Sequence, residues 1–260
     1  MACLTKLYFG WSAFFNELWP GDIKRSTPNT ELLQLYESEG VSPLSGQAAE
    51  QQLQMLIELS PDCTPQFLTQ RLKGRMNHWL RKTFNEFPGF DRSFFLRTLG
   101  QNTKSIVAKY IQSQVEDSDL VDPLYRERLN TLRFHDVDKR IVSGKHRGFY
   151  DLFVHLVLIS GNRYRMHFQE AKQVFSALRD ACEDLGACPY DISMMPDHAH
   201  LLVRWPADLS ANELVDKVKA GSGKKLGRLA FWSDGGYVGT VGPYRLSVAM
   251  EKNRLNGWVR

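Results

Sequence analysis

No part of this 260-residue sequence is apolar over the roughly 18 to 20 consecutive residues that a helix needs to cross a bilayer. The apolar run LYFGWSAFF, which begins at Leu7, is short, and the polar Asn16 and Glu17 follow it where a signal peptide would have a small-residue cleavage site. We therefore expect this run to form a strand. The absence of both kinds of segment predicts a cytoplasmic protein with no membrane partner.

Cysteine is also scarce, and its spacing argues against two classes of small protein. The cysteines occur singly, with no Cys-x-x-Cys pair, which disfavours a zinc ribbon and a disulfide framework. We expect reduced thiols, some of them in the core, at Cys3, Cys63, Cys182 and Cys188.

Neither sign of charge dominates the composition. The 33 Lys and Arg residues and 29 Asp and Glu residues give a net charge of +4, which permits a nucleic-acid partner without requiring one. With 43% apolar and 24% charged residues, the chain is typical of a globular protein. Its length suits one large domain or two smaller ones.

The second half of the chain shows strand and helix patterns in alternation. Apolar residues at helical spacing predict a helix over 168–185, with Gly186 as its C-cap. The other predicted elements are a buried strand over 149–160, a strand over 190–205, a helix that begins at Asn212, a turn at Gly235-Gly236 and a short strand over 237–241. This order predicts the α+β class, with helices packed on an antiparallel sheet.

The first half resembles the second, which suggests a tandem duplication. Residues 54–82 align without gaps on residues 200–228, with five identities in 29 positions and the same strand-turn-helix order. FFLRTLG, from Phe94, likewise resembles GYVGTVG, from Gly236. The alternative is that any two amphipathic α+β units look this similar. The duplication predicts a domain over 1–116, a polar linker with one helix over 117–147 and a second domain over 148–260.

The stretch MMPDHAHLLV, residues 194–203, places two histidines inside an apolar run that predicts a strand. Side chains alternate between the two faces of a strand, so His198 and His200 lie on one face and Ala199 on the other. Two imidazoles on one face can bind one metal ion if a third ligand comes from elsewhere. The alternative is that they line the solvent side of an edge strand.

Three segments in order, MPDHAHLLV, LVDKVKAGSGKKL and GYVGTVG, resemble the signature of the single-tyrosine HUH transposases of the 200/605 insertion-sequence type, which include repetitive-palindrome-associated relatives. The resemblance covers roughly residues 147–250 and, through the repeat, much of the first half. It implies two ferredoxin-like, HUH-type domains and a Mg²⁺ or Mn²⁺ ion held by both histidines. It also implies a late helix with the pattern Y-I-x-x-Q, whose tyrosine attacks a DNA phosphate and whose glutamine completes the metal site. Active members are dimers in which the tyrosine helix of one subunit can serve the other subunit's histidines.

The sequence departs from this family pattern in both halves. In the second half Lys252 stands at the tyrosine position, or Asn253 if the alignment slips by one residue. In the first half Gln52 and Gln54 stand where the histidines are expected. Each half has therefore lost a different part of the site.

The first half keeps the segment YIQSQ, which contains the tyrosine that the second half lacks. The second half keeps the histidines that the first half lacks, so the two losses are complementary. Tyr110 and Gln114 lie one turn apart on one face of a helix that Asn102 or Thr103 caps. The sequence thus predicts a single-chain pseudo-dimer with one composite site. Its nucleophile is Tyr110, and its metal ligands are His198, His200 and Gln114. Random decay of a duplicated gene gives the same pattern, and a homodimer is the alternative to this internally paired monomer.

The resemblance implies metal-dependent nicking and strand transfer of single-stranded DNA, with a hairpin, through a 5′-phosphotyrosine intermediate, by a nucleoid-associated enzyme. One alternative is a catalytically inactive, domesticated relative that binds single-stranded or hairpin DNA or RNA. Another is a metal-dependent hydrolase with an acidic third ligand, although no motif places a carboxylate for it.

Basic residues gather on two equivalent predicted helices, where they suit contacts to DNA phosphates or, alternatively, a solvated helix face. Arg163 and Arg165, after the first strand of the second half, are further candidates. The predicted DNA-binding residues are Lys73, Arg75, Arg81, Lys82, Lys217, Lys219, Lys224, Lys225 and Arg228.

Overall fold

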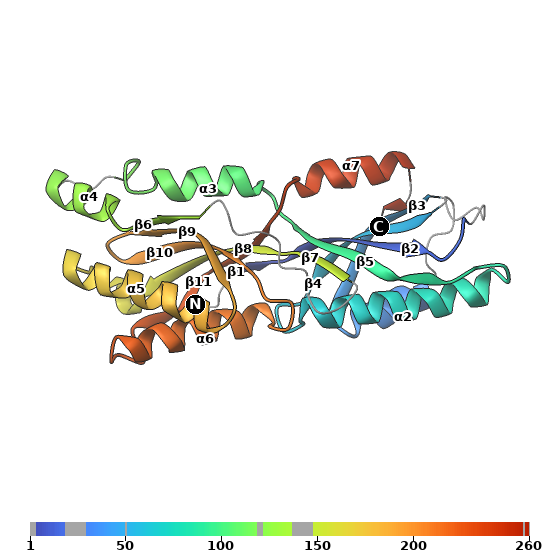
Figure 1. The fold of residues 1–260 in the computed structure, drawn as a ribbon, viewed down its shortest axis with the longest axis horizontal. Coiled ribbons are helices and arrows are strands. Elements are labelled where there is room, and N and C mark those ends of the chain that lie inside the picture. Colours follow the sequence, from blue (N-terminus) through green and yellow to red (C-terminus); the bar gives the residue numbers. More distant parts are fainter. Residues whose placement is uncertain are drawn as a thin grey trace.

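Two six-stranded sheets, one at each end of the long axis, form the framework of the molecule (Figure 1). The computed structural model describes residues 4–18, 30–49, 51–118, 122–136, 148–256 and 258–259. Cys3 and two parts of the predicted linker, 119–121 and 137–147, lie outside the described residues.

The sheet of the first half has the strand order of a ferredoxin-like fold at its centre. Its four central strands are antiparallel and lie in the order β3 (Val41–Ala49), β4 (Gln52–Leu59), β2 (Tyr8–Phe15) and β5 (Phe90–Leu99). Helices α1 (Thr30–Glu37) and α2 (Pro65–Thr83) follow β2 and β4 in the chain and cover one face of the sheet. The short strand β12 (Trp258–Val259) pairs with β3 at the edge.

The sheet of the second half repeats this arrangement. Its central strands lie in the order β9 (Cys188–Met194), β10 (His198–Arg204), β8 (Phe153–Ser160) and β11 (Trp232–Val241). Helices α5 (Phe168–Asp184) and α6 (Ala211–Lys225) take the places of α1 and α2. The linker supplies α4 (Pro123–Asn130) and the edge strand β6 (Arg133–His135). The predicted α+β class with two ferredoxin-like domains is confirmed.

Each sheet is completed by a strand from the other half of the chain. β1 (Leu4–Lys6) pairs in parallel with β11, and β7 (Gly148–Asp151) pairs in parallel with β5. Leu7 and Leu152, each 1% exposed, are the equivalent residues at which the backbone passes from one sheet into the other. The predicted single strand over 149–160 is therefore wrong, because the backbone changes sheets at Leu152.

Strands β5 and β11 cross where the two halves meet. The Thr98 hydroxyl accepts a hydrogen bond from the Phe153 N–H of β8 at 2.9 Å. The Thr240 hydroxyl accepts one from the Tyr8 N–H of β2 at 2.8 Å, so each bond joins the two halves. A Cβ atom on Gly100 would overlap the carbonyl oxygen of Thr240, and one on Gly242 would overlap that of Thr98. The similar segments RTLG and GTVG thus supply the threonine and the glycine that this close approach requires.

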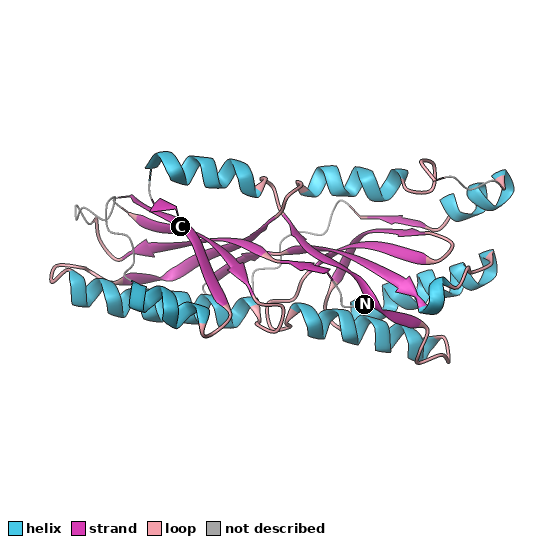
Figure 2. Ribbon diagram, turned by 180° about the vertical axis from the view of Figure 1, so that it is seen from behind, coloured by secondary structure: helices cyan, strands magenta, loops and turns pink. Residues whose placement is uncertain are grey.

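Helices α3 (Lys104–Ser113) and α7 (Leu246–Asn256) continue past this crossing onto the opposite half's sheet (Figure 1). The Lys104 N–H donates to the Gly242 carbonyl and the Leu246 N–H to the Gly100 carbonyl, both at 2.8 Å. As a result α3 packs on β9 and β10, and α7 packs on β3. Figure 2 shows these two helices in a row on one side of the sheets, with α2, α5 and α6 on the other.

The repeat is also visible where α2 and α6 begin. Thr64 and Ser210, which are equivalent in the gapless alignment, cap the two helices through their hydroxyls. Next to them, the Asn212 N–H donates to the Pro61 carbonyl at 3.1 Å, and the equivalent Gln66 N–H donates to the Ala207 carbonyl at 2.9 Å. The two halves therefore meet through reciprocal contacts, as expected for a duplicated chain.

Several local predictions are confirmed and others are wrong. The helix over 168–185 is α5, and Gly186 follows it with a φ of 69°. The strand over 190–205 is instead a hairpin of β9 and β10, since Pro196 lies in the turn between them. The predicted turn at Gly235-Gly236 lies within β11, where pairing with β8 shifts register. The linker contains a strand as well as a helix.

The domain limits 1–116, 117–147 and 148–260 stay a prediction. Cys63, Cys182 and Cys188 are free thiols. Among the helices formed by the described residues, none is long and apolar enough to cross a membrane.

Replacing Gly242 with alanine should destabilise the protein by at least about 1–3 kcal/mol, because the new methyl group overlaps backbone at the crossing. Chemical denaturation followed by circular dichroism measures this free energy. Gly74→Ala is the matched control, since Gly74 is exposed in α2 with open space around its Cβ position, and this change should stabilise by about 0.5–1 kcal/mol. Equal effects at the two positions would contradict the crossing geometry.

Candidate active site

Tyr110 comes from the first half of the chain and lies over the sheet of the second half. Helix α3 begins after Thr103, whose hydroxyl accepts a hydrogen bond from the Ile106 N–H at 3.4 Å. The helix is held on the sheet by a small buried cluster of Val107, Ala108, Ile111, Leu202 and Val241. This packing places the Tyr110 ring centroid 5.5 Å from that of His200, and the tyrosine remains 47% exposed.

His198 and His200 lie on the face of β10 that α3 covers. Their ring centroids are 5.0 Å apart, and Ala199 between them faces the opposite side and is fully buried. The alternative that these histidines line the solvent side of an edge strand is wrong, because β10 lies between β8 and β9 and His200 is only 4% exposed.

A third histidine, His155, belongs to the same cluster. It lies on β8 directly beside Leu202, and its Nε2 is 3.2 Å from His200 Nδ1. Its ring centroid is 6.2 Å from that of Tyr110. Burial lowers the pKa of His155 to about 4, so its imidazole is neutral near pH 7. The sequence contained a signal for it, because an imidazole in the apolar strand FVHLVLIS requires a polar partner when buried.

The arrangement of His200 suits a bound cation. Burial, with smaller contributions from His155 and His198, lowers the pKa of His200 to about 3, so the ring is neutral. Its Nδ1 is occupied by His155, whereas its buried Nε2 has no hydrogen-bond partner. A buried polar atom without a partner is costly, and a metal ion bound through Nε2 would satisfy it. The donor set therefore fits the divalent ion that the sequence predicts.

Asp197 orients the other histidine. Its Oδ1 accepts a hydrogen bond from His198 Nδ1 at 2.6 Å, and its Oδ2 accepts one from Arg163 at 3.1 Å. Burial would raise the pKa of Asp197, but these hydrogen bonds outweigh it and lower that pKa overall. With Nδ1 donating to a carboxylate, His198 keeps Nε2 as its free ring nitrogen, which is the usual arrangement behind a metal-binding histidine.

The predicted third ligand is not a histidine, cysteine or acidic residue but the amide of Gln114. Within the described part of the chain, no three His, Cys, Asp or Glu side chains form a group that could hold a metal ion. Gln114, the predicted amide ligand, is half-buried at the end of α3 with helical backbone angles, one turn beyond Tyr110. Gln114 therefore lies on the helix face that carries Tyr110.

A second polar cluster, not predicted from the sequence, fixes the end of the tyrosine helix. Asp191 on β9 is fully buried, and its Oδ1 lies 3.0 Å from Gln112 Nε2 and 2.6 Å from His135 Nδ1. Burial raises the pKa of Asp191, and the hydrogen bonds from Gln112 and His135 oppose that increase. Gln112 belongs to α3 and His135 to β6, so the linker strand and the sheet together hold the helix that carries Tyr110.

The equivalent position in the first half has neither imidazole nor phenol. Strand pairing confirms the equivalence, because Phe14 is paired with Gln52 where Ile159 is paired with His198. Gln54 instead accepts a hydrogen bond from Gln47 at 2.7 Å. Lys252 occupies the place of Tyr110 on α7, since α3 and α7 begin with the same pair of backbone hydrogen bonds.

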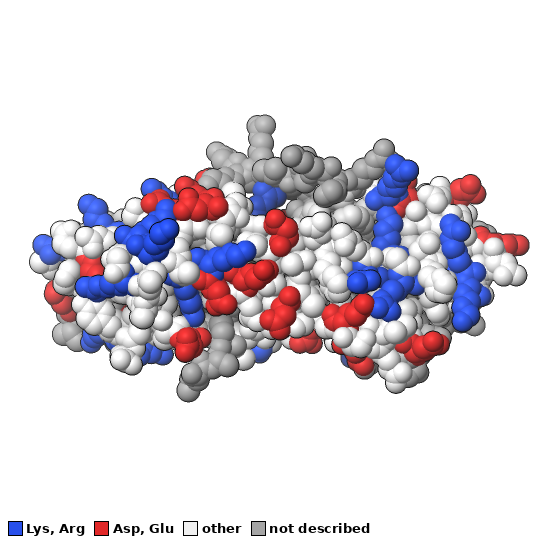
Figure 3. All heavy atoms as spheres, turned by 90° about the horizontal axis from the view of Figure 1, so that it is seen from below, with Lys and Arg blue, Asp and Glu red and all other residues white. Residues whose placement is uncertain are grey.

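Most of the predicted DNA-binding residues lie on the face of the sheets opposite Tyr110, because α2 and α6 both cover that face (Figure 1). Figure 3 shows that Lys and Arg gather toward the two ends of this face and Asp and Glu near its middle. Several of these cations also have protein partners. Arg75 is paired with Glu39, Lys73 with the Asp91 carbonyl, Lys219 with the Ser233 carbonyl, Lys225 with Asp184 and Arg228 with Glu170.

Two ferredoxin-like halves that share one histidine and tyrosine site define a chain of the HUH class. The family described as "Transposase IS200 like" matches residues 27–114 and 148–251, one segment in each half. This covers more than half of the sequence, and the chain belongs to that family. Members of the family process DNA and generally use a divalent metal ion.

The chain is also similar to a solved structure of a protein from Deinococcus radiodurans R1 that is assigned as a transposase. The two share 21% identity, and the match covers 44% of this chain and 95% of that chain with a TM-score of 0.34. No curated protein sequence matches the chain significantly.

In the metal-free protein, the free energy of unfolding should fall as the pH is lowered from about 6.5 to about 4. Over this range the unfolded chain protonates its histidines near pH 6.5, whereas folded His155 and His200 stay neutral to about 4 and 3. The slope is up to about 1.4 kcal/mol per pH unit for each group. Urea denaturation in the presence of a chelator measures it. His155→Phe should reduce the slope, and an unchanged slope would contradict the burial of a neutral His155.

Gln112→Ala should loosen the end of α3, because it removes the hydrogen bond that the helix donates to buried Asp191. We expect a loss of roughly 1–3 kcal/mol in the free energy of unfolding and faster amide hydrogen exchange in α3 than in α7. Lys109→Ala, at an exposed position on the same helix, is the control and should change neither quantity. Similar exchange rates in the two variants would show that the cluster does not hold the helix.

Proposed function

We propose that this protein nicks single-stranded DNA and transfers the cut strand through a 5′-phosphotyrosine intermediate, at one composite site in each chain. The observation that supports this most directly is the 5.5 Å separation between the ring centroids of Tyr110 and His200, which come from different halves of one chain. The family shows that DNA is the partner, and the geometry favours cleavage by this tyrosine.

The Tyr110 oxygen attacks the scissile phosphorus, and the bond from phosphorus to the 3′ oxygen breaks. This gives a 5′-phosphotyrosine bond and a free 3′-OH. Because Tyr110 is 47% exposed, water reaches its hydroxyl and can take the phenolic proton, while the leaving 3′ oxygen takes a proton from water. Attack by a different 3′-OH reverses the step and joins the strand, and the phosphotyrosine bond conserves the energy that this needs.

His198, His200 and Gln114 would hold a Mg²⁺ or Mn²⁺ ion, which when bound supplies positive charge against a phosphate oxygen. The protein prepares these ligands through neighbouring groups. Asp197 turns Nε2 of His198 toward the site, and His155 does the same for His200 by occupying its Nδ1. Burial keeps His200 unprotonated, so its lone pair is available near pH 7.

Incubation of the protein and Mn²⁺ with a labelled hairpin oligonucleotide carrying a single-stranded flank should give a covalent protein–DNA adduct on a denaturing gel. Tyr110→Phe should abolish the adduct, and His200→Ala should reduce it by about 10²-fold or more, as expected for loss of a metal ligand or electrostatic partner. Tyr244→Phe is the matched control, because Tyr244 is another exposed tyrosine, in the segment between β11 and α7. An adduct that survives Tyr110→Phe would overturn the proposed nucleophile.

Mixing the Tyr110→Phe and His200→Ala variants tests whether the site forms within one chain. Each mixed pair contains an intact tyrosine on one chain and intact histidines on another. An internally paired monomer leaves the mixture as inactive as its components. Recovery of the adduct would show that the two halves of the site come from different chains of a homodimer.

The replaced residues Gln52, Gln54 and Lys252 favour one competing function, a domesticated relative that binds single-stranded or hairpin nucleic acid without cutting it. The unpartnered Nε2 of His200 beside an exposed tyrosine argues for activity instead. Tight binding of the hairpin without any adduct in Mg²⁺ or Mn²⁺ would support the binding function.

A further inference from the structure

The Ser193 hydroxyl on β9 lies beside the histidines and is not used by the protein itself. Ser193 is fully buried. Strand pairing places it directly opposite His200 of β10, so both side chains project from the face that α3 covers. Within the described part of the chain, neither Ser193 Oγ nor His200 Nε2 has a hydrogen-bond partner. Two buried polar atoms that lack partners therefore lie on neighbouring strands under the tyrosine helix.

The orientation of the His200 ring directs its free nitrogen toward β9. His200 Nδ1 lies 3.2 Å from His155 Nε2, on β8. The two nitrogens of an imidazole lie on opposite edges of the ring, so His200 Nε2 is directed away from β8. Strand β10 lies between β8 and β9, and β9 carries Ser193. The Ser193 hydroxyl and the free Nε2 are therefore on the same side of the His200 ring.

The neighbour of Ser193 on the other side is engaged elsewhere. Arg133 of β6 is paired directly with Ser193, so its side chain projects from the same face. Its Nη2 is bound by Glu116, at 3.1 Å, and by Asn130. The guanidinium is thus held at the end of the linker strand, and the hydroxyl remains free for a ligand on the His200 side.

Ser193 also lies close to the end of α3 that carries Gln114. Gln112 donates to Asp191 at 3.0 Å, which holds this end of the helix over β9. Asp191 and Ser193 are two residues apart on β9 and so share one face of the sheet. Gln114 follows Gln112 by two residues. The hydroxyl is therefore placed between His200 and the helix end that carries the predicted amide ligand.

The equivalent pair in the first half has no unpartnered atom of this kind. Gln47 of β3 is paired with Gln54 of β4 where Ser193 is paired with His200, and the Gln47 amide donates to the Gln54 amide at 2.7 Å. Two long side chains thus reach each other across the strands. Serine is much shorter than glutamine, so a space between the hydroxyl and Nε2 remains in the second half. A space with two polar atoms at its edge suits a water molecule.

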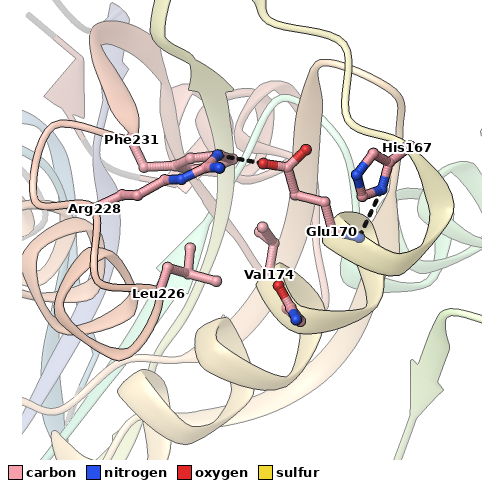
Figure 4. A pocket seen from close by; sticks show the side chains of 7 residues that line it. His167, Glu170, Val174, Leu226, Arg228 and Phe231 are labelled. Atoms are coloured by element: carbon pink, nitrogen blue, oxygen red, sulfur yellow. Dashed lines mark hydrogen bonds and ion pairs between the residues drawn. The ribbon is translucent and has the colours of Figure 1, made fainter.

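The cavity between α5 and α6, on the other face of the same sheet, gives a contrast (Figure 4). Glu170 is paired there with Arg228, and its N–H donates to His167 Nδ1 at 3.2 Å. A hydrogen bond to Glu170 also raises the pKa of the Tyr164 hydroxyl. The polar groups of that cavity bind one another, whereas the hydroxyl and the imidazole nitrogen under α3 do not.

We propose that Ser193 is a positioning residue of the metal site, whose hydroxyl binds a water ligand of the Mg²⁺ or Mn²⁺ ion beside His200 Nε2. The inference rests on the metal ligands assigned in the proposed function. These ions keep several water ligands when they bind to proteins, so a fixed hydroxyl that binds one of those waters favours binding of the ion. Without the ion, the same hydroxyl is a buried polar group that destabilises the fold.

Ser193→Ala in the full chain should therefore have opposite effects on the fold and on metal binding. In the presence of a chelator, the Tm should rise by about 2–4 °C, because a buried hydroxyl without a partner is removed. The Kd for Mn²⁺ should rise by about tenfold. Electron paramagnetic resonance of the free ion measures this Kd in the absence of DNA. His200→Ala, which removes a ligand, should raise the Kd further.

Ser45→Ala is the matched control, since Ser45 is also a fully buried serine on a strand, in the first half. Its hydroxyl accepts a hydrogen bond from Asn253 at 2.8 Å, so this change should lower the Tm and leave the Kd for Mn²⁺ unchanged.

An unchanged Kd for Mn²⁺ in Ser193→Ala would overturn the inference and leave the proposed function standing. A weaker Kd together with a lower Tm would assign the effect to the fold and would overturn it too. If the unsubstituted chain bound no Mn²⁺, the metal site of the proposed function would fail as well.

Discussion

The backbone contact between β5 and β11 determines where the helices that follow these strands, α3 and α7, lie. Each strand is followed by a glycine that lets the backbone pass against a carbonyl oxygen of the other strand, and the threonine two residues earlier accepts a hydrogen bond from the opposite half. The chain that leaves β5 is therefore directed onto the second sheet. The proximity of Tyr110 to His200 is thus a consequence of the crossing.

The two equivalent positions differ in how their polar groups are satisfied. On the first sheet the amides and hydroxyls pair with each other, as Gln47 does with Gln54 and Asn253 with Ser45. On the second sheet His200 keeps a buried nitrogen without a partner. A buried polar atom without a hydrogen-bond partner destabilises a protein unless a ligand binds to it. A position that no longer binds a ligand can instead form hydrogen bonds within the protein. At this position the first half has internally paired polar groups, and the second half has an unpaired imidazole nitrogen beside Tyr110.

The sequence predicted what depends on local pattern. Helical spacing located α5, and period-two alternation put His198 and His200 on one face. The sequence did not predict the features that depend on which strands become neighbours. The alternation of apolar and polar residues along a strand is the same whichever sheet the strand joins. Leu152 is one apolar residue in an apolar run, so nothing marked it as the point where the chain changes sheets. His135 lies on a three-residue strand with no detectable period, and its partnership with Asp191 arises only when β6 pairs with β9.

The exchange of β1 and β7 also affects how the protein assembles. Neither half completes its own sheet, so a separated half would expose an unpaired edge along β5 or β11 and would tend to recover a partner from another molecule. Joining the halves in one chain replaces that encounter with an intramolecular one, whose effective concentration is set by the linker. Because Tyr110 and His200 belong to one chain here, the 5.5 Å separation of their ring centroids requires no encounter between two molecules.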